Sequence, residues 1–344
     1  MSAINCGGCG QPSTNKCARC KIQHYCGRVC QTNHWAKHKS ECKYLYIEHA
    51  LQRVAHILQD TFLKFLENTW NHPLDKVVTT PNETFLYLGT KTEETLIEFP
   101  HGLMDDEETK MAVLTAGPSV NPTALFKDLL EGLLKDLDVK VEELTVVLGT
   151  FPRRTRLVLP NGATSPGVSN PKHDLISLSS NKTGRQWVFD LCGSQVGLYK
   201  PFWKFEDYNR RYVHSIHHRR PLGLNRWMLS EHAKLKGYEG VNLALNFEAS
   251  ISMYEEAKLW ETQHVPLTQL PTLPKDQFGE TKASLLQALN LRVQNFFRSS
   301  NYNERLRSAL AYQLVYPEQF KMEREQCAAR CCAKVTQSLL ESSH

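Results

Sequence analysis

Cysteine residues crowd the first 42 positions of the chain, and this crowding constrains the fold more than any other sequence feature. Seven of the 11 cysteines lie between Cys6 and Cys42, and the next one is Cys192. Such an uneven distribution is unlike the disulfide framework of a secreted protein. About forty residues with few hydrophobic side chains also need bound metal or cross-links to hold a structure. We therefore expect a metal-bound module at the N-terminus, the alternative being a set of free or disulfide-bonded cysteines.

The candidate metal ligands follow the pattern C-x2-C-x7-C-x2-C-x5-C-x3-C-x7-H-x3-C. They are Cys6, Cys9, Cys17, Cys20, Cys26, Cys30, His38 and Cys42. Four close pairs supply eight ligands, which is enough for two tetrahedral Zn²⁺ sites. The last two pairs are spaced i, i+4, which places each pair on one face of a helix. Sites filled entirely by protein ligands are structural, because no coordination position remains for a catalytic water.

This eight-ligand pattern resembles the MYND zinc finger, and the resemblance covers Cys6–Cys42, about an eighth of the chain. The spacing alone does not say which pairs share an ion. The resemblance implies that they interleave, with the first and third pairs on one zinc and the second and fourth on the other. The two implied ligand sets are Cys6, Cys9, Cys26 and Cys30 for the first zinc, and Cys17, Cys20, His38 and Cys42 for the second. His24 and His34 do not fit the spacing, and we expect them to lie outside both sets.

The resemblance also implies a class of partner. MYND fingers dock short peptides that contain proline and leucine beside a β-hairpin, with contacts from a glutamine and a tryptophan at the start of the last helix. Gln31 and Trp35 stand at those positions, one helical turn apart. Tryptophan offers a large apolar face, and glutamine can pair with a peptide backbone. The alternative is that Trp35 packs as a lid on the zinc site while Gln31 is merely exposed.

The rest of the chain has ordinary globular composition, 41% hydrophobic and 22% charged. We predict an α+β protein: a zinc finger over residues 1–43 and a mixed, helix-rich α+β domain over residues 44–344, here called the body. A connecting helix is expected at about 44–70. Strands are expected at 144–148, 173–179 and 185–192, among others. The expected helices of the C-terminal half are 204–218, 228–236, 246–261, 279–298, 302–315 and 318–341.

Two enzymatic interpretations of the body deserve a test against the sequence. MYND fingers occur in SET-domain lysine methyltransferases, but the signatures of that family are absent here. Cys327, Cys331 and Cys332 lie on the expected C-terminal helix with no histidine nearby, and we interpret them as small buried hydrophobic residues. The methyltransferase interpretation therefore ranks low.

His173 and Asp190, on neighbouring predicted strands, resemble the transglutaminase-like cysteine hydrolases. In that family the cysteine nucleophile lies upstream of the histidine, and no cysteine occurs between Cys42 and Cys192. Cys192 itself follows Asp190, which is the wrong place for a nucleophile. We expect no catalytic residues in this chain and at most a catalytically dead relative of that fold. The active hydrolase stands as the alternative.

Net charge and hydropathy limit the classes of partner and the cellular location that we expect. The net charge of +5 gives no large basic field, so we do not expect nucleic-acid binding. A basic stretch over residues 210–220 is interpreted as a solvated helix face. No run approaches the ~18 apolar residues of a membrane helix, and the N-terminus has no apolar signal segment. We expect an intracellular protein of the nucleus or cytoplasm: a non-enzymatic adaptor that recruits partners through the finger in transcriptional regulation or ubiquitin-pathway scaffolding.

Overall fold

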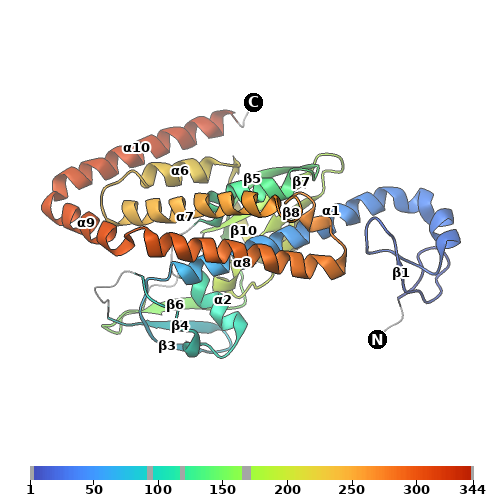
Figure 1. Cartoon of the computed structure of the whole chain (residues 1–344), viewed down its shortest axis with the longest axis horizontal. Helices are drawn as coiled ribbons and strands as arrows, with labels where there is room; N and C mark the ends of the chain where they lie inside the picture. The colour runs from blue at the N-terminus through green and yellow to red at the C-terminus, as the bar shows by residue number, and fades with distance from the viewer. Residues whose placement is uncertain (1–3, 91–95, 117–120, 165–171, 342–344) are drawn as a thin grey trace.

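One long helix links the two parts of the molecule. The computed structural model describes residues 4–90, 96–116, 121–164 and 172–341. The first three residues of the predicted finger and the last three of the predicted body therefore lie outside the described residues. Helix α1 (Arg28–Asn68) begins after the extended Gly27 and ends at Thr69. It passes without a break through residue 43, where the sequence placed the domain boundary. The finger at its start and the body at its end therefore share one rigid element (Figure 1).

Two sheets form the β part of the body. A five-stranded antiparallel sheet has the order β10-β5-β7-β8-β9, and a three-stranded sheet has the order β3-β4-β6 with β4 and β6 parallel. The strands are β3 (Leu74–Thr79), β4 (Glu83–Leu88), β5 (Val139–Leu148), β6 (Arg154–Val158), β7 (Lys172–Ser180), β8 (Gln186–Phe189), β9 (Phe202–Lys204) and β10 (Val213–Pro221). The strands predicted at 144–148, 173–179 and 185–192 correspond to β5, β7 and β8.

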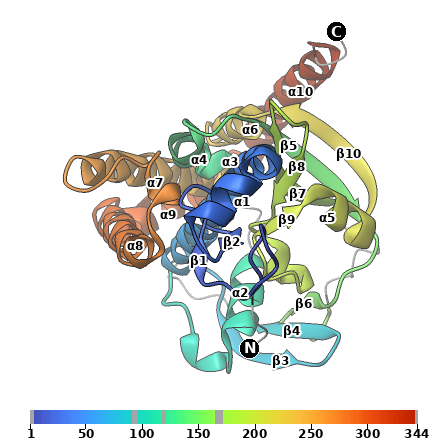
Figure 2. The same ribbon diagram turned by 90° about the vertical axis from the view of Figure 1, so that its right-hand side faces the viewer.

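Helices cover the large sheet and fill the C-terminal half (Figure 2). They are α2 (Glu107–Ala116), α3 (Pro122–Leu125), α4 (Lys127–Leu134), α5 (Phe205–Tyr212), α6 (Leu224–His232), α7 (Tyr238–Glu261), α8 (Lys275–Ser299), α9 (Tyr302–Val315) and α10 (Pro317–Glu341), with 3-10 turns η1 (His101–Leu103), η2 (Gly193–Val196) and η3 (Leu270–Thr272). The mixture of helices and sheets confirms the α+β class. Among the described residues, no helix combines the length and apolar character needed to cross a membrane.

The large sheet carries a different core on each face because side chains alternate along a strand. Ile176 and Leu178 join the main core, in which α1 packs with α4 and α8, and α7 packs with α8. Leu175 points to the opposite face and packs with Val188 and Tyr208 beneath α5. This smaller second core surrounds the His173–Asp190 region.

One expectation about the C-terminal half was wrong. The helix predicted over 204–218 divides into α5 and strand β10, because residues 213–221 pair with β5 and this long-range pairing overrides local propensity. Residues 266–274, which are rich in leucine and proline, connect α7 to α8 and pack on α1. Arg53 of α1 donates hydrogen bonds to the carbonyl oxygens of Pro271 and Leu273.

Candidate functional site

The finger contains a small antiparallel hairpin formed by β1 (Asn15–Lys16) and β2 (His24–Tyr25). One C-x2-C turn precedes the hairpin, and the other lies in the connection between its two strands. In the first turn, the Gly10 amide donates to the Cys6 carbonyl at 2.8 Å. Gly8 permits a close approach in this turn, since an added Cβ there would lie 2.9 Å from the Cys30 carbonyl oxygen. Short turns of this kind bring both cysteines of a C-x2-C pair to one point, as tetrahedral metal binding requires.

The first ligand set gathers at the start of α1. Cys6, Cys9, Cys26 and Cys30 place their sulfur atoms within 4.8 Å of one another. The Cys9 and Cys26 sulfurs are 3.6 Å apart, and those of Cys26 and Cys30 are 3.3 Å apart. Sulfurs bound to one Zn²⁺ at about 2.3 Å lie about 3.8 Å from each other. The set therefore fits a tetrahedral zinc ion.

The second ligand set is buried under the hairpin and comprises Cys17, Cys20, His38 and Cys42. The Cys17 and Cys42 sulfurs are 3.7 Å apart, and the Cys20 sulfur lies 3.6 Å from Nε2 of His38. The two groupings are those that the resemblance implied, so the interleaved arrangement is confirmed, and the finger fits two zinc ions.

The electrostatics of the finger also favour bound cations. Burial raises the pKa of the Cys42 thiol to about 12, and the neighbouring Cys17 adds to the rise. Hydrogen bonding to Cys26 raises the pKa of Cys30 to about 12. So many thiols packed together cannot all ionise unless a positive ion neutralises them, and a divalent metal supplies that charge.

The two candidate peptide contacts lie against the second zinc site. Nε2 of Gln31 is 3.5 Å from the Cys17 sulfur, and the Trp35 ring meets the His38 ring edge-on with centroids 6.0 Å apart. Both side chains are half-buried, so each supports the zinc site and keeps part of its surface open. His34 makes its contact with the Tyr25 hydroxyl, 3.0 Å from Nδ1, and belongs to neither ligand set.

Helix α1 contacts the sheet of the body close to the last zinc ligand, Cys42. The Tyr44 ring stacks on Trp187 of β8 with centroids 5.8 Å apart. The Arg185 guanidinium lies 3.5 Å from the centre of the same tyrosine ring and 3.3 Å from the Glu41 carboxylate. These contacts fix the direction in which the finger leaves the body.

The structure brings His173 and Asp190 together in the body. Nε2 of His173 lies 2.8 Å from Oδ1 of Asp190, and the Tyr208 hydroxyl donates to Oδ2 at 2.9 Å. Sequence reasoning missed Tyr208, because only the tertiary fold brings α5 over the sheet. The His173 side chain is 3% exposed and that of Asp190 is 0% exposed, so the pair has no open face for a substrate.

Cys192 lacks the features of a catalytic thiol. Burial raises its pKa, and the negative charges of Asp190 and Asp174 raise it further. A nucleophilic cysteine instead has a lowered pKa beside a cationic partner. The surroundings of Cys192 favour the neutral thiol at pH 7.

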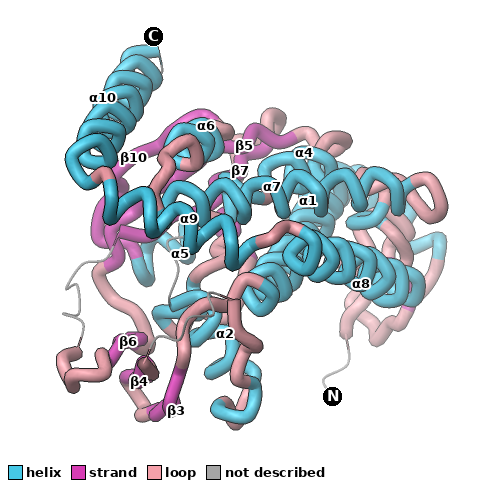
Figure 3. The backbone as a smooth tube through the Cα atoms, turned by 60° about the vertical axis from the view of Figure 1, so that its left-hand side comes forward, coloured by secondary structure: helices cyan, strands magenta, loops and turns pink. Residues whose placement is uncertain are grey.

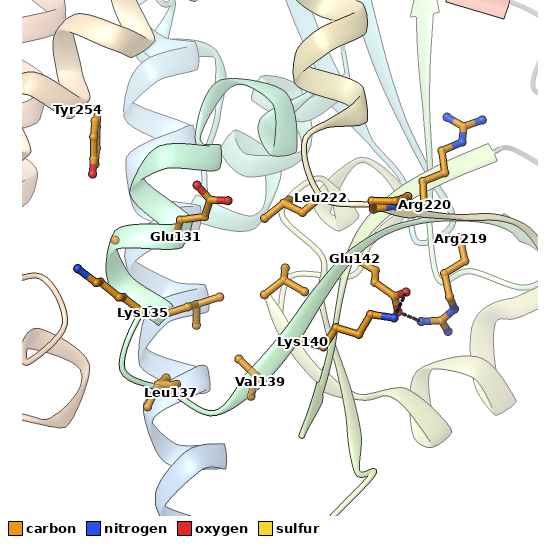
Figure 4. Close-up of a pocket in the computed structure, with 14 residues that line it drawn as sticks. Glu131, Lys135, Leu137, Val139, Lys140, Glu142, Arg219, Arg220, Leu222 and Tyr254 are labelled. Atoms are coloured by element: carbon orange, nitrogen blue, oxygen red, sulfur yellow. Dashed lines mark hydrogen bonds and ion pairs between the residues drawn. The ribbon is translucent and has the colours of Figure 1, made fainter. Parts of the chain in front are cut away.

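A cavity of about 910 Å³ lies between α4, β5, β10 and α7 (Figure 4). Its lining includes the apolar side chains of Leu134, Val139 and Leu222. At its rim, Glu142 forms ion pairs with Lys140 at 2.8 Å and Arg219 at 3.1 Å. Part of the predicted basic stretch is thus on a strand and already neutralised. Among the described residues that line this cavity there is no histidine or cysteine.

A third cluster of metal-binding side chains was missed by the sequence reasoning. His232 lies close to Cys327 and Cys331, although 99 residues separate His232 from Cys331. The expectation that no histidine is near these cysteines was therefore wrong. Nothing in the local sequence could reveal the contact, since it arises from the packing of α6 on α10.

Comparison with known proteins supports the finger. The family model of the MYND finger matches residues 6–42. Over 39 residues in the N-terminal part, the chain is 49% identical to ubiquitin carboxyl-terminal hydrolase 19 of Arabidopsis thaliana. That match covers 11% of this chain and 6% of the relative. No solved structure matches the chain significantly.

Proposed function

We propose that this chain, whose residues 6–42 form a MYND finger, is a non-enzymatic adaptor that recruits protein partners through that finger. The observation that carries the proposal is the placement of Gln31 and Trp35 one turn apart on α1, each half-buried. An apolar ring beside an amide suits a short extended peptide that contains proline and leucine. Such peptides are the proposed ligands.

The chemistry of the finger supports binding over catalysis. Each zinc set offers four protein ligands, and closed sites of this kind stabilise a fold without activating water. In the body, the buried His173–Asp190 pair and the neutral Cys192 thiol favour a structural role over hydrolysis. The adaptor proposal therefore assigns the body to presentation of the finger.

The named relative suggests a setting. That relative is a ubiquitin carboxyl-terminal hydrolase, but the match covers 6% of it, so the shared segment brings no hydrolase chemistry to this chain. A docking module shared with such a protein favours ubiquitin-pathway scaffolding. Transcriptional regulation is the other proposed setting, and nucleus and cytoplasm are the corresponding compartments.

Affinity capture from a lysate of the source cells tests the proposal. The baits are the full-length wild type, the Gln31→Ala/Trp35→Ala variant and an Asn33→Ala/Lys37→Ala control. The control changes exposed positions on the same turns of α1. Because Gln31 contacts a zinc ligand, the zinc content of each bait is measured first.

We expect partners with proline- and leucine-containing segments to bind the wild type and the control. They should be lost from the Gln31→Ala/Trp35→Ala variant at unchanged zinc content. Synthetic peptides from those segments should then compete for the wild type. The same partner list for all three baits would contradict recruitment through this surface.

A further inference from the structure

We propose that His232, Cys327 and Cys331 form a third metal site that holds one Zn²⁺ and ties α10 to α6. Cys327 and Cys331 belong to α10, and His232 is the last residue of α6. The two sulfur atoms and one nitrogen of the His232 ring all lie within 4.8 Å of one another. Two thiolates and an imidazole are the ligand types that zinc prefers.

The geometry of this cluster resembles that of the finger. Cys327 and Cys331 are spaced i, i+4 on a helix, as are His38 and Cys42 within α1. The Cys331 sulfur is 3.9 Å from Nδ1 of His232, against 3.6 Å between Cys20 and His38. A tetrahedral zinc would draw sulfur and nitrogen to about 3.5 Å, which is a side-chain adjustment of a few tenths of an ångström.

A disulfide does not compete for these two thiols. Side chains spaced i, i+4 on a helix have Cβ atoms ≈ 5–6 Å apart. A disulfide needs ≈ 3.5–4.5 Å between its Cβ atoms. The bond would require α10 to unwind, so the thiols of the folded helix stay available to a metal.

The surroundings hold the ligands in place and leave one coordination position open. Nδ1 of His232 also lies 2.8 Å from the Met228 carbonyl oxygen. Zinc coordination through Nδ1 would replace that hydrogen bond, whereas coordination through Nε2 would keep it as a contact that orients the ring. The neighbouring Glu231 is already paired with Lys234 and with Arg330. With three protein ligands, the fourth position would belong to water or to a ligand from outside the chain.

The site would explain how α10 is anchored. This helix projects from one end of the molecule and lies against α6 (Figures 1 and 3). In its described part only four side chains are buried, and two of them are Cys327 and Cys331, 1% and 8% exposed. Phe320 and Leu235 complete the small apolar cluster around the thiols. A zinc ion would add two coordinate bonds to α10, through Cys327 and Cys331, and one to α6, through His232.

Zinc content of the full-length protein tests the proposal directly. Zinc per chain is counted by plasma mass spectrometry after gel filtration in zinc-supplemented buffer. We expect three ions in the wild type and two in a Cys327→Ala/Cys331→Ala variant, which keeps the cluster apolar. The matched control is Cys332→Ala, an exposed cysteine on the same helix, which should keep three. His232→Gln should also bind two, and it leaves both thiols in place if the double variant folds poorly.

Hydrogen exchange provides a second readout. Added zinc should slow the exchange of α10 amides in the wild type and leave the Cys327→Ala/Cys331→Ala variant unchanged. Two zincs in the wild type, or equal counts in wild type and double variant, would overturn the site. Zinc-independent exchange of α10 in the wild type would show that the cysteines are apolar packing residues only.

Discussion

Replacing Asp190 by asparagine should lower the free energy of unfolding of the body by about 3–5 kcal/mol near neutral pH. Asp190 is fully buried and accepts hydrogen bonds from both His173 and Tyr208. Asparagine keeps the size of the side chain but removes the charge that the His173 ring faces. The penalty is large because a buried partner left without its counter-charge cannot be solvated.

The decrease in the free energy of unfolding caused by Asp190→Asn should depend on pH in a predictable direction. Burial disfavours the charged His173 ring, but the attraction of Asp190 outweighs burial and raises the pKa of His173 above its ordinary value of 6.5. A group with a raised pKa in the folded state stabilises the protein fully below its unfolded pKa. That stabilisation disappears as the pH rises through the folded pKa. The deficit of Asp190→Asn should therefore be largest below 6.5 and shrink at higher pH.

Urea denaturation followed by tryptophan fluorescence at about pH 6 and about pH 9, with constant zinc, measures this deficit. Asp174→Asn is the control for an exposed neighbouring carboxylate, because Asp174 lies next to His173 on β7 and adds a smaller attraction that also raises the pKa of His173. This control substitution should lower the free energy of unfolding by no more than about 1 kcal/mol. A deficit below about 1 kcal/mol for Asp190→Asn, or one that grows with pH, would refute the proposed buried ion pair.

Two further predictions concern the second zinc site and Cys192. His38→Ala removes one ligand of the second zinc site, so the full-length protein should hold one zinc fewer and lose protease resistance in the finger while the body melts as before. Zinc counting and limited proteolysis check this, and a retained zinc would show that the ligand assignment is wrong. Because its pKa is raised by burial, Cys192 should react slowly with a thiol reagent at neutral pH. Rapid labelling that disappears in His173→Ala would restore the hydrolase interpretation.

The parts of the fold that sequence could predict are those that local spacing determines. The finger ligands lie within 42 residues, and turns and one helix bring them together. Helix α9 has the predicted bounds, 302–315, because its apolar periodicity and its ends are local signals. The division of the ligands into two sets could not be predicted from spacing, because spacing permitted two arrangements. Only the family resemblance chose between them.

The parts that escaped prediction depend on contacts between distant segments. Residues 213–221 include three histidines, two arginines and one proline, a composition that fits the end of a solvated helix. They form β10 instead because they pair with β5. Tyr208 completes the Asp190 hydrogen bonds only once α5 folds over the sheet. His232 meets Cys331 only when α6 and α10 pack together. No local pattern encodes such encounters, so the candidate third site could be found only in three dimensions.

The continuity of α1 gives the adaptor proposal its physical content. A helix of 41 residues is about 60 Å long and resists bending over that length. His38 and Cys42 hold zinc on one stretch of it, and Leu51 and Leu58 are fully buried in the body core on the next. Tyr44, between the two stretches, stacks on the sheet, so no hinge separates finger from core. A peptide bound beside Trp35 would therefore be held at a fixed position relative to the body, as a scaffold requires and a flexibly tethered finger could not provide.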